Sequence, residues 1–349
     1  MTSLVASFSK GRTIRLSEVV ERTAAGILVL GVLAWVILNL AKAPTQFFTV
    51  LLAGLNNGAL FALIALGYTL VYGIIELINF AHGDLFMLGT ILCANMMANW
   101  LGLTKPGLTG FLGLILTMIV VMIFGATVNM GAEFFAYRRL RNAPKLAPLI
   151  TAVGLSFIFQ NIGQRVNGSS PKQWGTVFDP QSGFSVAGVR IRWSFLVVLT
   201  VTALLLLGLT YIVQRTRQGK AMRATAQDQD GARLMGVNVN ATISFTFALG
   251  GAMAGAAAVL YMETIGTTRF EAGFQLGLIA FTAAVLGGIG NLVGAVIGGL
   301  LIGVIQGLND GAPYGLGQDW SQTVVFSILI LVLVFKPEGL LGRRTTEKV

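Results

Sequence analysis

The segment RTRQGKAMRATAQDQDGARLMGVNVN, residues 215–240, lies between two long uncharged runs at 194–214 and 241–262. Each run has the length of a membrane-spanning helix, which needs about 20 mainly apolar residues. The segment itself holds five basic residues against two acidic ones, and short basic loops between spans face the cytoplasm. The sequence therefore predicts two membrane helices joined by an internal basic loop.

The same loop is also rich in helix-forming residues and ends at Gly236, a residue type that commonly terminates helices. This pattern predicts a short helix at the cytoplasmic face, presented to a partner that pushes on it. The alternative is an ordinary basic loop that only anchors the topology.

Composition extends this prediction to the whole chain, which is 55% hydrophobic and only 11% charged, with a mean hydropathy of +0.78. Soluble domains carry about 25% charged residues. We therefore predict an all-α integral membrane protein with about ten transmembrane helices. The candidate spans are 23–41, 47–73, 85–103, 108–132, 146–163, 193–213, 241–262, 276–290, 291–309 and 321–336.

Charge asymmetry sets the predicted orientation. The first apolar run, 23–40, is longer than the hydrophobic region of a signal peptide, so we interpret it as a retained first helix. Alternating the spans from an internal N-terminus places most of the Lys and Arg residues on one side. This predicts a multi-pass protein of the cell inner membrane with both termini cytoplasmic, comprising a cytoplasmic extension (1–22), a transmembrane domain (23–341) and a cytoplasmic tail (342–349).

Several function classes are disfavoured. Cys93 and His82 are the only residues of their types, so an intrachain disulfide, a cysteine metal cluster and Ser/His/Asp hydrolysis have little support, and we predict neither a metal site nor catalytic residues. The net charge of +10 gathers at span ends, which fits membrane topology better than nucleic-acid binding. The chain lacks a phosphate-binding G-x-x-x-x-G-K-[ST] loop, so ATP-driven transport would need a separate ATPase to hold ATP and magnesium.

Glycine is frequent, with 44 residues, and many lie four apart. Small residues at this spacing let membrane helices approach closely. The candidate packing residues are Gly290, Gly294, Gly298, Gly299 and Gly303. Two spans also look interrupted, at 56–58 and at 287–291, and broken helices mark transport paths in many transporters.

Unusual polar residues gather in 67–89, GYTLVYGIIELINFAHGDLFMLG. Ionisable groups at membrane depth are costly and usually functional, which favours a translocation path here. The alternative is a turn at the cytoplasmic face, where the same groups cost little. The candidate path residues are Tyr68, Tyr72, Glu76, Asn79, His82 and Asp84.

Three stretches carry a family resemblance: the run 56–89, the loop GKAMRATAQDQDGARLMGVNVN, and FTAAVLGGIGNLVGAVIGGLLIG. Together they resemble the permease subunits of branched-chain amino acid ABC importers, over roughly residues 47–341. The resemblance implies a type II importer fold, a second permease subunit, two cytoplasmic ATPases and an external substrate-binding protein. It also implies that the segment matched by 217–238 couples to the ATPase.

The candidate coupling residues combine the family's matching positions with two basic residues of the same loop. They are Arg217, Lys220, Arg223, Ala224, Asp228, Ala232 and Gly236. Urea and amide importers use a closely similar permease, so the cargo stays open at this point. An ion-coupled secondary transporter of a small polar solute, with Glu76, His82 or Asp84 carrying a proton, is a second possibility, and an intramembrane enzyme is a third.

Overall fold

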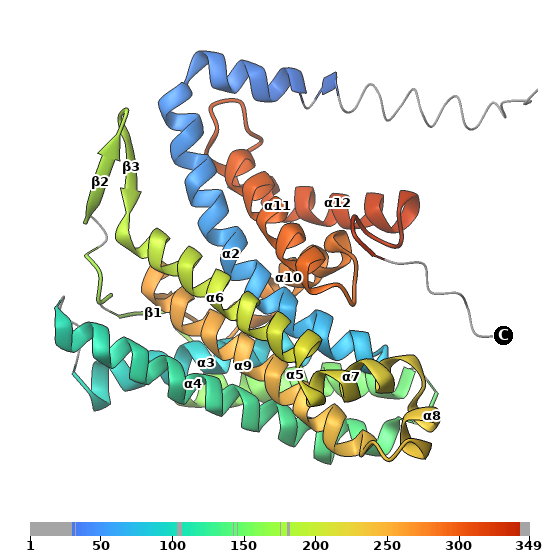
Figure 1. Cartoon of the computed structure of the whole chain (residues 1–349). Coiled ribbons are helices and arrows are strands. Elements are labelled where there is room, and N and C mark those ends of the chain that lie inside the picture. Colours follow the sequence, from blue (N-terminus) through green and yellow to red (C-terminus); the bar gives the residue numbers. More distant parts are fainter. Residues whose placement is uncertain are drawn as a thin grey trace, which may run out of the picture.

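The computed structural model describes residues 30–31, 33–102, 107–141, 143–144, 146–174, 176–179 and 182–342. The predicted extension (1–22), residues 23–29 and 32 of the first candidate span and residues 343–349 lie outside these ranges. The described part is mainly helical (Figure 1). An apolar helix at Leu33–Lys42 precedes α2 (Pro44–Ile75), α3 (Ala81–Asn95), α4 (Leu108–Phe135), α5 (Leu146–Asn167), α6 (Trp193–Arg215), α7 (Arg217–Gln227), α8 (Gln229–Leu234), α9 (Val239–Ile265), α10 (Ala272–Gly287), α11 (Leu292–Gly311) and α12 (Ser321–Phe335).

Short elements complete the chain. A π-helical turn (Met96–Trp100) follows α3, and 3₁₀ turns follow α4 (Tyr137–Leu140) and precede α12 (Gln318–Trp320). The connection between α5 and α6 contains an antiparallel hairpin of β2 (Gly183–Val186) and β3 (Val189–Arg192). Strand β1 (Lys172–Gln173), in the same loop, pairs with β4 (Thr267–Thr268), which lies between α9 and α10.

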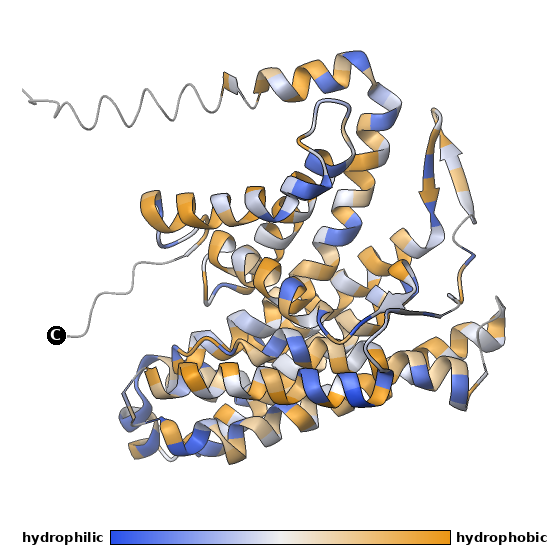
Figure 2. Ribbon diagram, turned by 180° about the vertical axis from the view of Figure 1, so that it is seen from behind, coloured by the Kyte–Doolittle hydropathy of each residue, from blue (hydrophilic) through white to orange (hydrophobic). Residues whose placement is uncertain are grey.

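The all-α membrane architecture is confirmed, but the expected count of about ten spans is not. Within the described residues, seven helices are long and apolar enough to cross a membrane: α2, α4 with its 3₁₀ turn, α5, α6, α9, α11, and α12 with its preceding turn. Helices α3 and α10, of 15 and 16 residues, are shorter than a full span. Apolar residues cover most of the helices (Figure 2).

Helices α2 and α9 form the centre of the molecule, because both are apolar around their whole circumference and both are largely buried. Helices α6 and α12, by contrast, are mostly exposed. The expected interruption of the second span at 56–58 is wrong, since α2 runs unbroken through it. Gly58 lies where α11 crosses, and a side chain there would meet the Leu300 backbone at 2.8 Å. Close packing therefore overrides the weak helix propensity of glycine and asparagine.

Glycines of α11 face two different neighbours. A side chain at Gly299 would meet the Ala62 backbone of α2 at 2.6 Å, and one at Gly303 would meet Gly58 of the same helix. On another face, Gly294 and Gly298 lie against the α10 backbone. Only residues without a side chain permit helix backbones to approach so closely.

The break between α10 and α11 lies where the sequence predicts it. Helix α10 ends at Gly287, and Gly288 and Gly290 take positive φ values of 102° and 90° that favour glycine. Asn291 then caps α11, its side chain accepting a hydrogen bond from the Gly294 N–H at 3.1 Å. The candidate spans 276–290 and 291–309 are thus two separate helices, α10 and α11.

Candidate functional site

The predicted polar cluster lies at the turn between α2 and α3. Glu76 ends α2 in a left-handed conformation and is exposed. Asn79, His82 and Asp84 are buried, with at most 4% of their surfaces exposed. These three side chains are therefore not solvated, although the segment does form a turn between α2 and α3.

Asn79 fixes this turn through hydrogen bonds to neighbouring helices. Its side-chain oxygen accepts a hydrogen bond from the Tyr137 hydroxyl at 2.7 Å, and its nitrogen donates to Asn129 at 3.3 Å. Asn129 in turn donates to the Phe247 carbonyl of α9 at 2.7 Å. The start of α3 is thereby tied to α4 and α9 through buried amides.

Asp84 is the centre of a second buried network. The Ser156 hydroxyl donates to its Oδ2 atom, and the Gln160 side-chain nitrogen donates to Oδ1 at 3.2 Å. Both partners lie one helical turn apart on α5, so they share a face. Sequence analysis missed them because they are uncharged residues within an apolar span; the i, i+4 pair of polar residues was the available signal.

A groove opens beside this network, which we call the α5 groove. Its volume is about 490 Å³. It is bounded by the start of α3, one face of α5 and the start of α10. The lining residues are Phe80, Val153, Ser156, Phe157, Gln160, Glu271, Phe274 and Gln275.

Aromatic rings close the groove on one side. Phe80 contacts Phe281, with ring centroids 6.1 Å apart, and Phe281 contacts Tyr68 at 6.0 Å. Beyond these rings lies a pocket of about 10 Å³, lined in part by Tyr68 and Tyr72, which has room for no more than a water molecule. His82 packs edge-on against Tyr68 rather than lining either space. The predicted path residues thus fall into three groups: Tyr68 and Tyr72 line a small pocket, Asn79, His82 and Asp84 are packed in the interior, and Glu76 is exposed.

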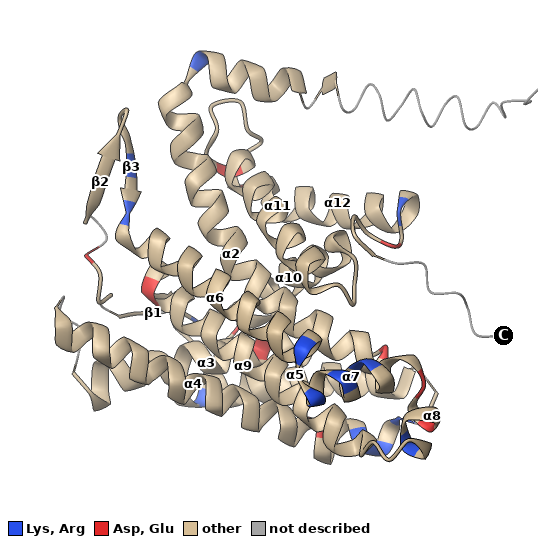
Figure 3. Cartoon of the chain, in the orientation of Figure 1, with Lys and Arg blue, Asp and Glu red and all other residues tan. Residues whose placement is uncertain are grey.

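The basic loop forms two short helices rather than the single one predicted. Thr216 caps α7 and Asp228 caps α8, each accepting a backbone N–H at 3.0 Å. Gly236 follows α8 with φ of 82°, and Asn238 then caps α9. The basic residues concentrate at this end of the molecule (Figure 3).

The candidate coupling residues differ in exposure. Arg217, Lys220 and Asp228 are exposed, whereas Ala224 is half-buried and Ala232 is buried. Arg223 is exposed but donates to the Val213 carbonyl at the end of α6, so it holds α7 against its neighbour. Two apolar residues of the same segment, which sequence analysis did not single out, are highly exposed.

Those residues are Leu234 and Met235, with exposed fractions of 88% and 85%. They stand at the end of α8, among the basic residues. Exposed apolar side chains rimmed by charge are typical of a protein-binding surface.

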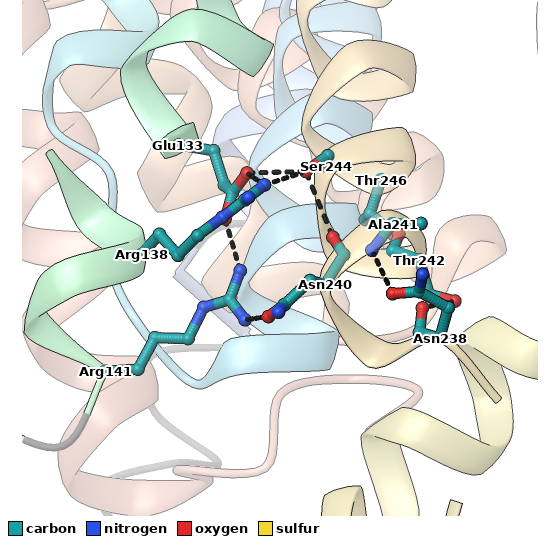
Figure 4. Close-up of polar contacts among 9 residues, drawn as sticks. All are labelled: Glu133, Arg138, Arg141, Asn238, Asn240, Ala241, Thr242, Ser244 and Thr246. Atoms are coloured by element: carbon teal, nitrogen blue, oxygen red, sulfur yellow. Dashed lines mark hydrogen bonds and ion pairs between the residues drawn. The ribbon is translucent and has the colours of Figure 1, made fainter. Parts of the chain in front are cut away.

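A buried ion-pair cluster joins this end to the helix bundle (Figure 4). The fully buried Glu133 carboxylate at the end of α4 accepts hydrogen bonds from Arg138 at 2.8 Å and 3.1 Å, from Arg141, and from the Ser244 hydroxyl at 2.6 Å. Arg141 also donates to Asn240 of α9 at 2.7 Å. The α4–α5 connection is therefore clamped to the first turns of α9.

These features define a membrane transport subunit: a bundle of apolar helices, an open groove that carries polar side chains, and an exposed helical element at the basic end. The sequence model of one family, the permease component of the branched-chain amino acid transport system, matches residues 50–333. The chain belongs to this family.

Characterised relatives match over nearly their whole lengths. The chain is 41% identical to the high-affinity branched-chain amino acid transport system permease protein BraD of Pseudomonas aeruginosa, over 86% of this chain and 97% of that protein. It is 37% identical to the corresponding permease protein LivH of Escherichia coli K12, over 85% of this chain and 96% of that protein.

The chain is also similar, over a shorter region, to a permease of a different import system. The autoinducer 2 import system permease protein LsrC of Yersinia pestis is 30% identical, over 39% of this chain and 40% of its own length. No solved structure matches the chain.

Proposed function

We propose that the chain is the membrane-spanning permease subunit of an ATP-binding-cassette importer that carries branched-chain amino acids into the cell. It works beside a second permease subunit, identical or similar to it, with two cytoplasmic ATPases and an external binding protein. ATP and magnesium bind to the ATPases, and this chain uses no cofactor. The complex lies in the cell inner membrane with both termini of this chain cytoplasmic.

The observation that carries this proposal is the α7–α8 segment. Both of its helices are capped by their own side chains, so the segment keeps its shape without a partner. Its tip presents Leu234 and Met235 among basic residues. Exposed apolar residues rimmed by charge mark interaction surfaces, which supports docking of a partner protein at this tip.

Force applied to this segment has a defined route into the bundle. Helix α7 packs against α2, α6 and α9, while α8 leads into α9 through the Asn238 cap. The clamp at Glu133 joins the start of α9 to the end of α4. Movement of α7–α8 by the ATPases would thus shift central helices and change which side of the path is open, an alternating-access mechanism.

The test is ATP-driven uptake by the reconstituted transporter, including its ATPases and binding protein. We expect leucine uptake that depends on ATP and is unaffected by dissipating a proton gradient, which distinguishes an importer of this type from an ion-coupled transporter. Urea or small amides as cargo, in place of leucine, would overturn the proposed cargo.

The docking surface is tested by the paired substitution Leu234→Asp and Met235→Asp. We expect the ATPases to be lost on co-purification and uptake to cease, because charged groups cannot fill an apolar groove. The control is Val186→Asp in β2, an apolar residue with 55% of its surface exposed, outside the basic end. Full association and uptake by the paired variant would mean that α7–α8 is only a topological anchor.

A further inference from the structure

The α5 groove combines polar side chains with aromatic rings. Four of its eight lining residues are polar (Ser156, Gln160, Glu271 and Gln275) and three are phenylalanines. Hydrocarbon cannot satisfy hydrogen-bonding groups, so polar side chains among membrane helices indicate a water-filled path or a ligand site. A volume of about 490 Å³ is in the range of small-molecule sites.

Asp84 determines which atoms of its two partners remain available. The Ser156 hydroxyl uses its only proton on Asp84, and the Gln160 amide nitrogen donates to the same carboxylate and, at 3.3 Å, to the Ser156 oxygen. What remains for the groove is acceptor capacity: a lone pair of the Ser156 oxygen and the Gln160 carbonyl oxygen. A ligand that bonds to these atoms must be a hydrogen-bond donor.

The charge around the groove is negative, which also favours a hydrogen-bond donor. Asp84 lies directly behind Ser156 and Gln160, and Glu271 lines the groove itself, at the start of α10. None of the described residues that line the groove is basic. The groove therefore favours a cationic donor, and its phenylalanines favour an apolar group beside that cation.

We propose that the α5 groove binds the amino-acid cargo during its passage, with Ser156 and Gln160 accepting hydrogen bonds from its α-ammonium group. The aliphatic side chain of the cargo lies among the phenylalanine rings. The Gln275 amide provides a donor for its carboxylate. This assignment rests on the proposed function and sharpens it, because a neutral amide or urea lacks the cation that the groove selects.

Asp84 acts in this scheme as a positioning residue. In Asp84→Asn, one of the two carboxylate oxygens becomes an NH₂ group. Whichever way the new amide orients, either the Ser156 hydroxyl or the Gln160 NH₂ loses its acceptor and can turn to the groove as a donor. The acceptor for the ammonium is then replaced by a donor. A purely structural role would weaken every ligand alike, whereas this role changes the preference between ligands.

The experiment measures ligand binding to the permease–ATPase complex in nanodiscs without the external binding protein, whose own selectivity would obscure that of the permease. Saturation-transfer NMR compares leucine with 4-methylpentanoate, which lacks only the ammonium group. We expect leucine to bind about tenfold more tightly or better, as for loss of a hydrogen bond to a charged group.

Ser156→Ala and Gln160→Met should each remove most of this preference, and Asp84→Asn should abolish it. The matched control is Asn161→Leu, an exposed neighbouring amide on α5 that bonds the Phe157 carbonyl of its own helix. Equal binding of the two ligands by the wild type, or an unchanged preference in all three variants, would overturn the assignment. ATP-driven uptake by the same wild-type preparation with its binding protein separates the cases: uptake without the preference refutes only the groove, whereas absent uptake refutes the proposed function.

Discussion

The α5 groove and the α7–α8 segment each hold side chains of a polarity that is unusual for their surroundings, and the two cases are opposite. The groove holds polar side chains among membrane helices, and the segment holds apolar side chains at the charged end of the chain. In the first region, polar atoms are oriented by a buried carboxylate; in the second, helix caps hold the backbone so that apolar residues stay exposed. Each arrangement costs stability unless a ligand or partner compensates it, so the comparison marks both regions as functional.

The groove is also backed by glycine-packed helices. The largest effect is expected from Gly298→Leu, because a leucine side chain there would run into the Ala283 carbonyl of α10. We expect loss of assembly in detergent-solubilised membranes, measured by size-exclusion chromatography. Gly208→Leu is the control, as nothing lies within 4 Å of a side chain at that position. Normal assembly and uptake by Gly298→Leu would mean that α10 and α11 are free to separate.

The joint between the two regions is the Glu133 clamp. Glu133→Ala leaves Arg138 and Arg141 without their carboxylate, and breaking a buried ion pair typically costs about 3–5 kcal/mol. We expect a clearly lower melting temperature and uncoupled ATP hydrolysis, measured on one preparation.

Asp230→Ala is the matched control for the clamp. It removes the ion pair between Asp230 and Arg233, whose side chains are 87% and 56% exposed respectively. Exposed ion pairs contribute little to stability. We expect no measurable change in its melting temperature. An equally small effect of Glu133→Ala would show that the basic end is joined to the bundle by backbone packing alone.

The sequence predicted features that depend on composition and local pattern. Membrane class follows from long apolar runs, and the break after Gly287 and the end of α8 near Gly236 follow from glycine conformations. The spacing of the α11 glycines also indicated close helix contact, without identifying α2 and α10 as the neighbours.

Features that depend on tertiary contacts were not predicted. The chain gives no local sign that α2 continues through Asn56, since the compensating contact comes from α11. Ser156 and Gln160 approach Asp84 across more than 70 positions of sequence, and only the fold brings them together. Residues such as Leu234 were overlooked because an apolar residue is expected to be buried, and its exposure is visible only in three dimensions.

The smallest effect is expected at Asp228, the residue that caps α8 in the α7–α8 segment. Asp228 accepts the Asp230 N–H at the start of α8, and loss of such a cap costs about 1 kcal/mol. Asp228→Ala should therefore leave assembly and cargo binding unchanged but speed amide hydrogen exchange across 229–236, and raise the ATP consumed per leucine carried. Asp228→Asn, which keeps a capping oxygen, should remain close to wild type in both measurements. Faster exchange with an unchanged ratio of ATP consumed to leucine carried would mean that α8 need not be preformed, because the ATPase would order it on docking. The fixed shape of α8 would then be a property of the complex and not of this chain alone.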